Sequence, residues 1–271
     1  MKSKKPDSPF TLKNGTVFIN PDQIRLVIFD KDGTLSDLNM WFEIMKKRAR
    51  ELGAYFSLPT RQINQIIIAM GLEPERNEIL DFGILTKSRP ETEKAVANKL
   101  VEFGIDAQTA LEVTHKIFGE VDRTTDHVAI AKPLGDLQKL FREIYESGIK
   151  IAIATSDLAE RGSRIMEAFG VLDYISIIAG ADSIKNDKPA PDMILKICKD
   201  LAIPPSKAAM VGDNVWDHQM AKNAGCALSI GVLTGKDDYE TMSEFADCVV
   251  ESVNNIKIES RSQKEKIMGN L

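Results

Sequence analysis

The sequence predicts a doubly wound α/β domain with a parallel sheet, interrupted after its first strand by a helical insertion. A short apolar run, RLVIFD (residues 25–30), is followed by a long stretch with helical periodicity and almost no strand pattern. From about residue 132 onward, short β-branched runs alternate with helix-period segments, a pattern typical of parallel strands joined by crossover helices. The α/β core domain is therefore expected to comprise residues 1–37 and 129–271, and the helical domain residues 38–128.

The elements follow in chain order. After the first strand, the helical domain is expected to hold four helices, near 41–53, 60–71, 91–104 and 106–121. Further strands are expected at 149–155, 174–180, 207–213, 227–232 and 247–252, with helices near 135–147, 158–169, 190–202, 215–224 and 238–245. Gly148, Gly170 and Gly225 follow three of these helices, where a C-terminal glycine is common. Residues 1–22 carry only weak signals and are expected to be a small addition to the core.

Composition excludes several functional classes. The net charge of −5 and the pI near 5.4 argue against a nucleic-acid-binding protein, although a local site for a small anion is still possible. No apolar run approaches the roughly 18 residues of a membrane span, and the first ten residues lack the apolar stretch of a signal peptide. The three cysteines have no CxxC spacing and are expected to be reduced thiols. We therefore predict a cytoplasmic protein without a membrane or nucleic-acid partner.

Polar residues gather where the predicted strands of the α/β part end. Ligands bind at the carboxyl ends of the strands in an open parallel sheet, so these residues are expected to converge. Each has an ordinary alternative: Asp-Gly is a common turn, Thr155 could cap a helix, and Asp217 could be a first-turn helix acid. Four such coincidences in one order are much less probable than any single one. The residues are Asp30, Asp32, Thr155, Ser156, Asp157, Lys188, Asp213 and Asp217.

Phosphoryl transfer is the chemistry that these residues could perform together. Several carboxylates in one cleft raise each other's pKa unless a divalent cation neutralises them, and oxygen ligands suit Mg²⁺. Because the cation needs only some of these carboxylates, one aspartate could act as a nucleophile and another as an acid. A lysine and a hydroxyl would hold the oxygens of the transferred group.

The motifs DKDGTL, IAIATSD, KPAPD and GDNVWD, in this order, resemble the four motifs of the haloacid dehalogenase (HAD) superfamily. The segment DHQMAKNAGCALSIGVLTG resembles its phosphoglycolate phosphatase-like branch. The resemblance implies a Rossmann-like core and a helical cap domain. It also implies roles: nucleophile for Asp30, acid and base for Asp32, phosphate binding for Thr155, Ser156 and Lys188, and Mg²⁺ binding for Asp30, the Asp32 carbonyl, Asp213 and Asp217.

The residue pair Asp30 and Asp32 favours phosphate-ester chemistry within that superfamily. Dehalogenase members have no alcohol leaving group to protonate and usually lack the second acid, so the presence of Asp32 argues against carbon-halogen hydrolysis. Lys31 stands where the family usually has an apolar residue, and its side chain is expected to point to the opposite face with little effect.

The predicted function is Mg²⁺-dependent hydrolysis of a small phosphorylated metabolite through an aspartyl-phosphate, with phosphoglycolate as the first candidate. The helical domain, as a cap, would exclude water and read the substrate. Trp41, Lys87 and Arg89 are the candidate specificity residues, although buried packing or solvation is the commoner role for such residues. The alternatives are a phosphomutase or phosphonatase of the same superfamily, or a non-catalytic binding protein on the same scaffold.

Overall fold

The computed structural model describes residues 8–76, 78–80 and 89–259. The chain divides into two compact units. Residues 1–37 and 131–271 form one, called here the α/β unit, and residues 38–130 form the other, called here the helical unit. Each unit is described by itself.

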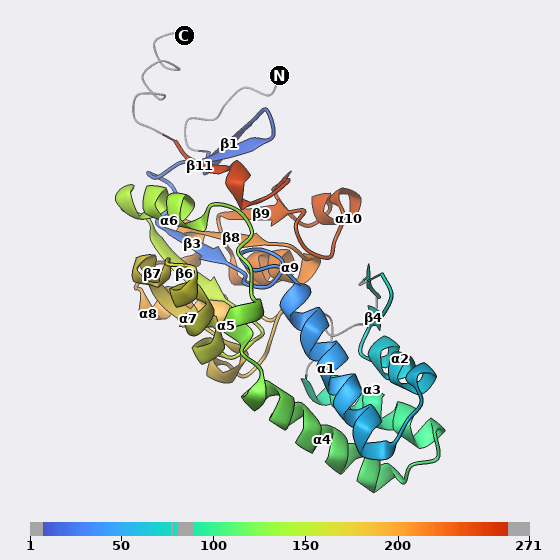
Figure 1. The fold of residues 1–271 in the computed structure, drawn as a ribbon. Coiled ribbons are helices and arrows are strands. Elements are labelled where there is room, and N and C mark those ends of the chain that lie inside the picture. The colour runs from blue at the N-terminus through green and yellow to red at the C-terminus, as the bar shows by residue number, and fades with distance from the viewer. Residues whose placement is uncertain (1–7, 77, 81–88, 260–271) are drawn as a thin grey trace, which may run out of the picture. The chain divides into compact units, whose positions relative to one another are not determined.

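The α/β unit contains a six-stranded, fully parallel sheet in the order β10-β9-β8-β3-β6-β7 (Figure 1). Each of its strands lies within a segment that the sequence predicts to be a strand, so the predicted α/β fold with a parallel sheet is confirmed. The strands are β3 (Leu26–Phe29), β6 (Lys150–Ala154), β7 (Ile175–Ala179), β8 (Ala208–Gly212), β9 (Leu228–Val232) and β10 (Cys248–Val250).

Helices cover both faces of this sheet. On one face, Ile28 of β3 lies in a buried cluster with Ile194 of α8 and Met220 of α9. On the other face, Phe29 of β3 stacks on Phe141 of α6, with ring centroids 5.2 Å apart. This two-sided burial explains why the strands are apolar throughout rather than alternating. The helices are α6 (Leu137–Glu146), α7 (Ala159–Ala168), α8 (Asp192–Asp200), α9 (Val215–Ala224) and α10 (Tyr239–Ser243), with 3₁₀ turns at Leu172–Tyr174, Ala181–Ser183, Pro205–Lys207 and Val253–Asn255.

A second, three-stranded sheet joins the two ends of the described chain. β1 (Phe10–Lys13) and β2 (Thr16–Ile19) form an antiparallel hairpin, and β11 (Ile256–Ile258) pairs with β2 in parallel. The turn residues Asn14 and Gly15 both have positive φ, 48° and 69°, as a tight hairpin turn requires. Residues 1–22 were expected, from weak signals, to be a small addition to the core, and no strand was predicted there; the Asn-Gly pair was the signal for this hairpin.

The helical unit contains the four predicted long helices and two features that were not expected. The additional features are the short α5 (His127–Ile130) and a two-stranded antiparallel sheet of β4 (Leu72–Glu73) and β5 (Glu78–Ile79). None of the described helices has the length and apolarity that a membrane span needs. The long helices are α1 (Asn39–Phe56), α2 (Thr60–Ala69), α3 (Arg89–Glu102) and α4 (Ala107–Thr124).

Candidate active site

The strand order of the main sheet reverses next to β3. After β3 the chain adds β6 and β7 on one side, and it then returns to add β8, β9 and β10 on the other. In open α/β sheets, ligands bind outside the carboxyl ends of the strands at such a reversal. Asp30 directly follows β3 and Asp213 directly follows β8, so both lie at this point.

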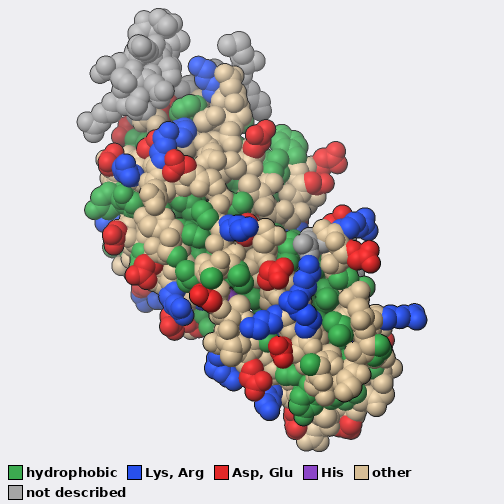
Figure 2. All heavy atoms as spheres, in the orientation of Figure 1, with side chains coloured by type: hydrophobic (Ala, Val, Ile, Leu, Met, Phe, Trp, Pro, Cys, Tyr) green, Lys and Arg blue, Asp and Glu red, His purple; other side chains and the backbone are tan. Residues whose placement is uncertain are grey.

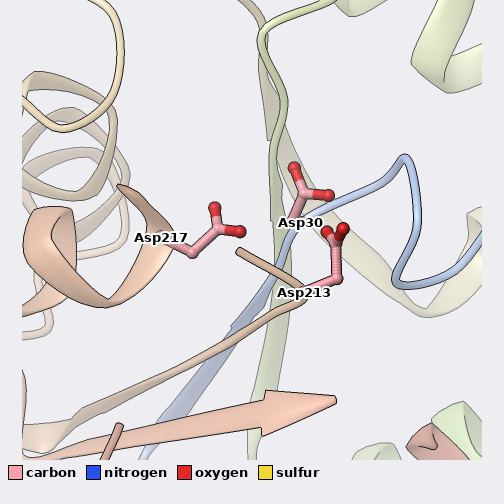
Figure 3. Close-up of side chains that lie close together, drawn as sticks. All are labelled: Asp30, Asp213 and Asp217. Atoms are coloured by element: carbon pink, nitrogen blue, oxygen red, sulfur yellow. The ribbon is translucent and has the colours of Figure 1, made fainter. Parts of the chain in front are cut away.

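Three buried carboxylates converge there. Asp30, Asp213 and Asp217 each place one carboxylate oxygen within 4.8 Å of the others, and Figure 3 shows the three side chains turned toward a common space. Asp217 comes from the first turn of α9, which begins directly after the loop at Asn214. At most 5% of any of the three residues is exposed. The structure therefore brings together three of the predicted metal ligands.

Lys188 is the counterion of this cluster. Its buried ammonium group donates to the Asp30 carboxylate at 2.5 Å and to the Asp217 carboxylate at 2.7 Å. Burial alone would lower the pKa of Lys188, but the Asp217 and Asp30 carboxylates outweigh that effect and raise it, so the lysine is charged. One lysine faces three carboxylates, which leaves the cluster with excess negative charge.

Burial raises the pKa of all three carboxyl groups. Desolvation is the main cause at Asp30, where the pKa rises to about 6 because the opposing attraction of Lys188 is only partly effective and Asp217 adds repulsion. Desolvation also raises the pKa of Asp213 well above its ordinary value, with Asp30 and Asp217 adding to it, and desolvation raises the pKa of Asp217. Without a further cation, the ionised cluster is unfavourable.

The cluster has the chemistry of a divalent-cation site. Its donors are carboxylate oxygens, the ligands that hard cations such as Mg²⁺ prefer. Asp217 Oδ2 is buried and has no hydrogen-bond partner among the residues that the structure describes, which is costly unless a cation or water contacts it. A buried Asp217 oxygen that lacks such a contact, next to excess negative charge, fits the Mg²⁺ ion that the sequence predicts.

Asp213 is fixed by the loop after β3 and the loop after β9. Thr34 donates its hydroxyl hydrogen bond to Asp213 Oδ1 at 3.2 Å, and the Lys236 backbone N–H donates to Oδ2 at 3.3 Å. A Cβ atom at Gly33 would lie 2.3 Å from Asp213 Oδ2, and one at Gly235 would lie 1.7 Å from it. Both glycines are therefore required for the close approach. Lys236 and Gly235 were missed by the sequence analysis, although the LTG triplet after a predicted strand is a possible signal.

Two of the predicted phosphate-binding residues, Thr155 and Ser156, follow β6, the strand beside β3. The Thr155 hydroxyl is buried and accepts a hydrogen bond from the Asp157 backbone N–H at 3.1 Å, so its own proton is not used in that bond. Ser156 is exposed and donates to Asp187 at 2.8 Å; the same Asp187 carboxylate accepts the backbone N–H of Lys188.

The Lys31 side chain was expected to point to the opposite face from the two acids, and this is wrong for its ammonium group. Its side chain is fully buried, and its ammonium group donates to Asp32 Oδ1 at 2.5 Å and lies 3.3 Å from Asp157 Oδ2. Strand alternation does direct its stem toward α7, where Gly162 leaves room for it. However, β3 ends at Phe29, so Lys31 lies beyond the strand. Its long side chain bends so that the ammonium group contacts the Asp32 carboxylate. The charged end of a lysine side chain does not have to follow the direction of its Cβ atom, which is why the prediction failed.

Comparison with known proteins places this site in a family. Residues 24–225 match the family model described as haloacid dehalogenase-like hydrolase, a range that contains Asp30, Asp32, Thr155, Lys188, Asp213 and Asp217. The chain belongs to this family. It is thus a hydrolase, and the suspected HAD membership is confirmed.

Individual relatives of this HAD-like hydrolase cover most of its length. It is 28% identical over 246 residues to phosphoglycolate phosphatase of Escherichia coli strain K12, covering 87% of this chain and 92% of the relative. The phosphoglycolate phosphatase of Salmonella typhimurium is 28% identical, with 86% and 91% covered. The crystal structure of a predicted phosphoglycolate phosphatase from Haemophilus somnus shares the fold, with a TM-score of 0.64, 17% identity, and 85% and 95% covered.

The predicted specificity residues of the HAD-like hydrolase belong to the helical unit. Trp41 lies half-buried in the first turn of α1, and Lys87 lies outside the described residues. Arg89 begins α3, and its guanidinium binds the carboxylates of Glu93 and Asp122. A substrate that used Arg89 would therefore have to compete with two carboxylates.

Proposed function

We propose that this HAD-like hydrolase is a Mg²⁺-dependent phosphatase that hydrolyses a small phosphate monoester through an aspartyl-phosphate on Asp30. The observation that carries this proposal is the position of Asp30 at the sheet reversal, held by Lys188 and opposed by two further buried carboxylates. The relatives named as phosphoglycolate phosphatases support the same reaction class.

In the first step, a carboxylate oxygen of Asp30 attacks phosphorus while the bond to the ester oxygen breaks. Asp32, two residues along the same loop, gives its proton to the departing alcohol oxygen. The Lys188 ammonium group remains beside Asp30 and offsets the charge of the phosphoryl oxygens, and the Thr155 hydroxyl donates to one of them.

In the second step, Asp32, now a carboxylate, takes a proton from water. The water oxygen attacks phosphorus, the bond to Asp30 breaks, and inorganic phosphate leaves with the Asp30 carboxylate regenerated. The proton that Asp32 gave to the alcohol is thereby restored, so Asp32 ends the cycle as it began.

Asp30, Asp213 and the backbone carbonyl of Asp32 would hold Mg²⁺, with Asp217 as a further ligand or neighbour. When bound, the cation neutralises the carboxylates and the phosphoryl charge that must approach them. The same neutralisation would keep Asp30 ionised at neutral pH despite its raised pKa, which nucleophilic attack requires.

We propose 2-phosphoglycolate as the first substrate to test, because the curated relatives carry that name. The helical unit, inserted between β3 and β6, would act as a cap. The segments that lead into and out of the helical unit are hydrogen-bonded to each other within the α/β unit. The Asp37 N–H donates to the Lys132 carbonyl, and the Leu134 N–H donates to the Leu35 carbonyl. A cytoplasmic location remains a prediction.

The decisive experiment compares wild type with Asp30→Asn on p-nitrophenyl phosphate and on a panel of phosphorylated metabolites that includes 2-phosphoglycolate. Each assay is run with Mg²⁺ and again with EDTA. We expect Mg²⁺-dependent phosphate release by wild type, none by Asp30→Asn, and acid-stable incorporation of ³²P only when Asp30 is present. The matched control is Asp200→Asn, which makes the same substitution at an exposed aspartate of α8.

A wild type that is inactive on the whole panel with Mg²⁺ would support the non-catalytic reading instead. Isomerised sugar phosphate without net phosphate release would indicate a phosphomutase. Equal activity in Asp30→Asn would refute the aspartyl-phosphate while leaving hydrolysis itself intact.

A further inference from the structure

Lys31 and Asp157 form a second charged network beside the cluster at Asp30. Lys31 Nζ lies between the Asp32 carboxylate at 2.5 Å and the Asp157 carboxylate at 3.3 Å. The Asp157 side chain is 3% exposed and the Lys31 side chain is fully buried, so the three charges sit largely out of water. No role in the reaction proposed above requires either residue.

The network is anchored at its far end to α7 and to the loop after β6. Arg161 of α7 donates to Asp157 Oδ1 at 2.7 Å, and the Leu158 N–H donates to the same oxygen at 2.8 Å. The Asp157 N–H binds the Thr155 hydroxyl. Asp157 therefore has a fixed position, set by several hydrogen bonds that do not involve Lys31.

Asp32 has no comparable anchor of its own. Among the described residues, the hydrogen bond found for its carboxylate comes from Lys31, and 14% of its side chain is exposed. Its backbone belongs to a turn in which Gly33 has a φ of 85°. The position of the Asp32 carboxylate thus depends on the Lys31 ammonium group. That ammonium group lies beside the Asp157 carboxylate, and the Lys31 side chain packs where Gly162 has no side chain.

We propose that Lys31 is a positioning residue that holds the Asp32 carboxyl group at the reaction centre and ties its placement to the Thr155 loop through Asp157. The proposal rests on the proposed function, because it assigns Lys31 an effect only through the proton transfers of Asp32. A displacement of about 1 Å at a reacting group can cost about 100-fold in rate, so loss of this contact is expected to be large.

The reaction itself offers a readout that a merely structural role would not move. An alkyl phosphate needs Asp32 to protonate its leaving oxygen, whereas p-nitrophenolate leaves readily as an anion. In Lys31→Met we expect phosphoenzyme formation from 2-phosphoglycolate, or from the best alkyl phosphate of the panel, to slow by about 10- to 100-fold. Formation from p-nitrophenyl phosphate should slow less than about 3-fold.

Water activation also depends on Asp32, so the second step should slow for both substrates. Rapid mixing of Lys31→Met with p-nitrophenyl phosphate should therefore give a burst of one p-nitrophenol per enzyme, followed by slow turnover. Lys196→Met is the matched control, because Lys196 pairs with Asp200 on the exposed surface of α8. It should behave as wild type.

A double-mutant cycle with Asp32→Asn decides between positioning and general disruption. If Lys31 acts through Asp32, adding Lys31→Met to Asp32→Asn should lower the rate by less than about 3-fold. Multiplicative losses, or equal slowing of phosphoenzyme formation from alkyl and aryl substrates, would overturn the proposal. If Lys31→Met does not fold, Asp157→Asn serves in its place, because it removes the anchor of the ammonium group. It should show the same alkyl-selective loss.

Failure of the two proposals can be told apart. Wild type without Mg²⁺-dependent phosphatase activity overturns the function and the Lys31 role together. Active wild type, impaired Asp32→Asn and an unaffected Lys31→Met would overturn the role of Lys31 alone.

Discussion

Asp30→Asn should stabilise the metal-free protein while it abolishes turnover. In the folded chain, burial raises the pKa of Asp30 from 3.8 to about 6. The shift of about two units corresponds to about 3 kcal/mol in favour of the protonated form. With respect to this group, the folded state has its full advantage below about pH 4 and loses it as the pH rises through about 6. At pH 8 in EDTA, wild type therefore bears the whole cost of an ionised Asp30.

Asparagine removes that cost but also the charge that faces Lys188, which then relies on Asp217. The pKa of about 6 already includes the attraction of Lys188, so about 3 kcal/mol is the upper limit of the stabilisation expected at pH 8. That corresponds to a rise in melting temperature of at most about 12 °C. Below about pH 5 the difference between the two proteins should shrink or reverse.

Thermal melts of both proteins from pH 5 to 8, in EDTA and in Mg²⁺, provide the measurement. Mg²⁺ should raise the melting temperature of wild type more than that of Asp30→Asn, because the variant offers one ligand fewer. Asp200→Asn, from an exposed pair on α8, should stay within about 0.5 kcal/mol of wild type. An Asp30→Asn protein that melts below wild type at pH 8 in EDTA would refute the conclusion that the ionised cluster is unfavourable.

Three further substitutions test other contacts. Lys188→Met should lower kcat by about 100- to 1000-fold, which steady-state rates measure. It should not weaken Mg²⁺ binding, which calorimetry measures, since it removes positive charge from the site. Gly235→Ala should raise the Mg²⁺ half-saturation concentration by about 10-fold or more, because its Cβ would lie 1.7 Å from Asp213 Oδ2; a Mg²⁺ titration of activity checks this. Arg48→Met should lower the free energy of unfolding by about 2 kcal/mol in urea titrations, because it deletes one of the two arginines that bind Asp122 and leaves Arg89 as its partner.

The predictions for Lys188 and Gly235 each have an outcome that would contradict them. Weaker Mg²⁺ binding in Lys188→Met would mean that the lysine organises the ligands rather than opposing the cation. Unchanged Mg²⁺ dependence in Gly235→Ala would mean that the loop after β9 can yield without moving Asp213. Gly119→Ala in α4 is a suitable glycine control, since its Cβ would meet only the end of the Arg123 side chain, at 3.4 Å.

The six main strands and the long helices could be predicted because their burial is regular. Strands covered on both faces appear as apolar runs, and each ends where a polar residue marks the sheet edge, as Asp30 and Asp213 do. The strands of the second sheet were missed because they are only partly buried and so do not appear as continuous apolar runs. Their length is not the reason, since β3 and β10 have only four and three residues and were predicted.

The convergence at the site could also be predicted, because strand order alone brings the ends of β3 and β8 together. The enclosure of Asp213 could not, since close approach depends on atoms that Gly33 and Gly235 lack. Absence of a side chain leaves no pattern in a single sequence beyond the identity of the glycine. The reason for glycine at these two positions becomes apparent only from the three-dimensional position of the Asp213 carboxylate.

The two acids of the DKDGTL motif differ in the cation that each faces. Asp30 faces Lys188, which it shares with Asp217, whereas Asp32 faces Lys31, which it shares with Asp157. Asp30 and Asp32 are only two positions apart but belong to different networks. The network of Asp30 is anchored in α9 through Asp217, and the network of Asp32 is anchored in α7 through Arg161, which binds Asp157. Because each lysine is shared with a carboxylate outside the motif, a change at one acid need not displace the other. In the proposed reaction, phosphorylation of Asp30 would alter the charge around Lys188. Asp32 would keep its own counterion, Lys31, for the proton transfer that follows, so a nucleophile and a proton donor acting in sequence would gain from this separation.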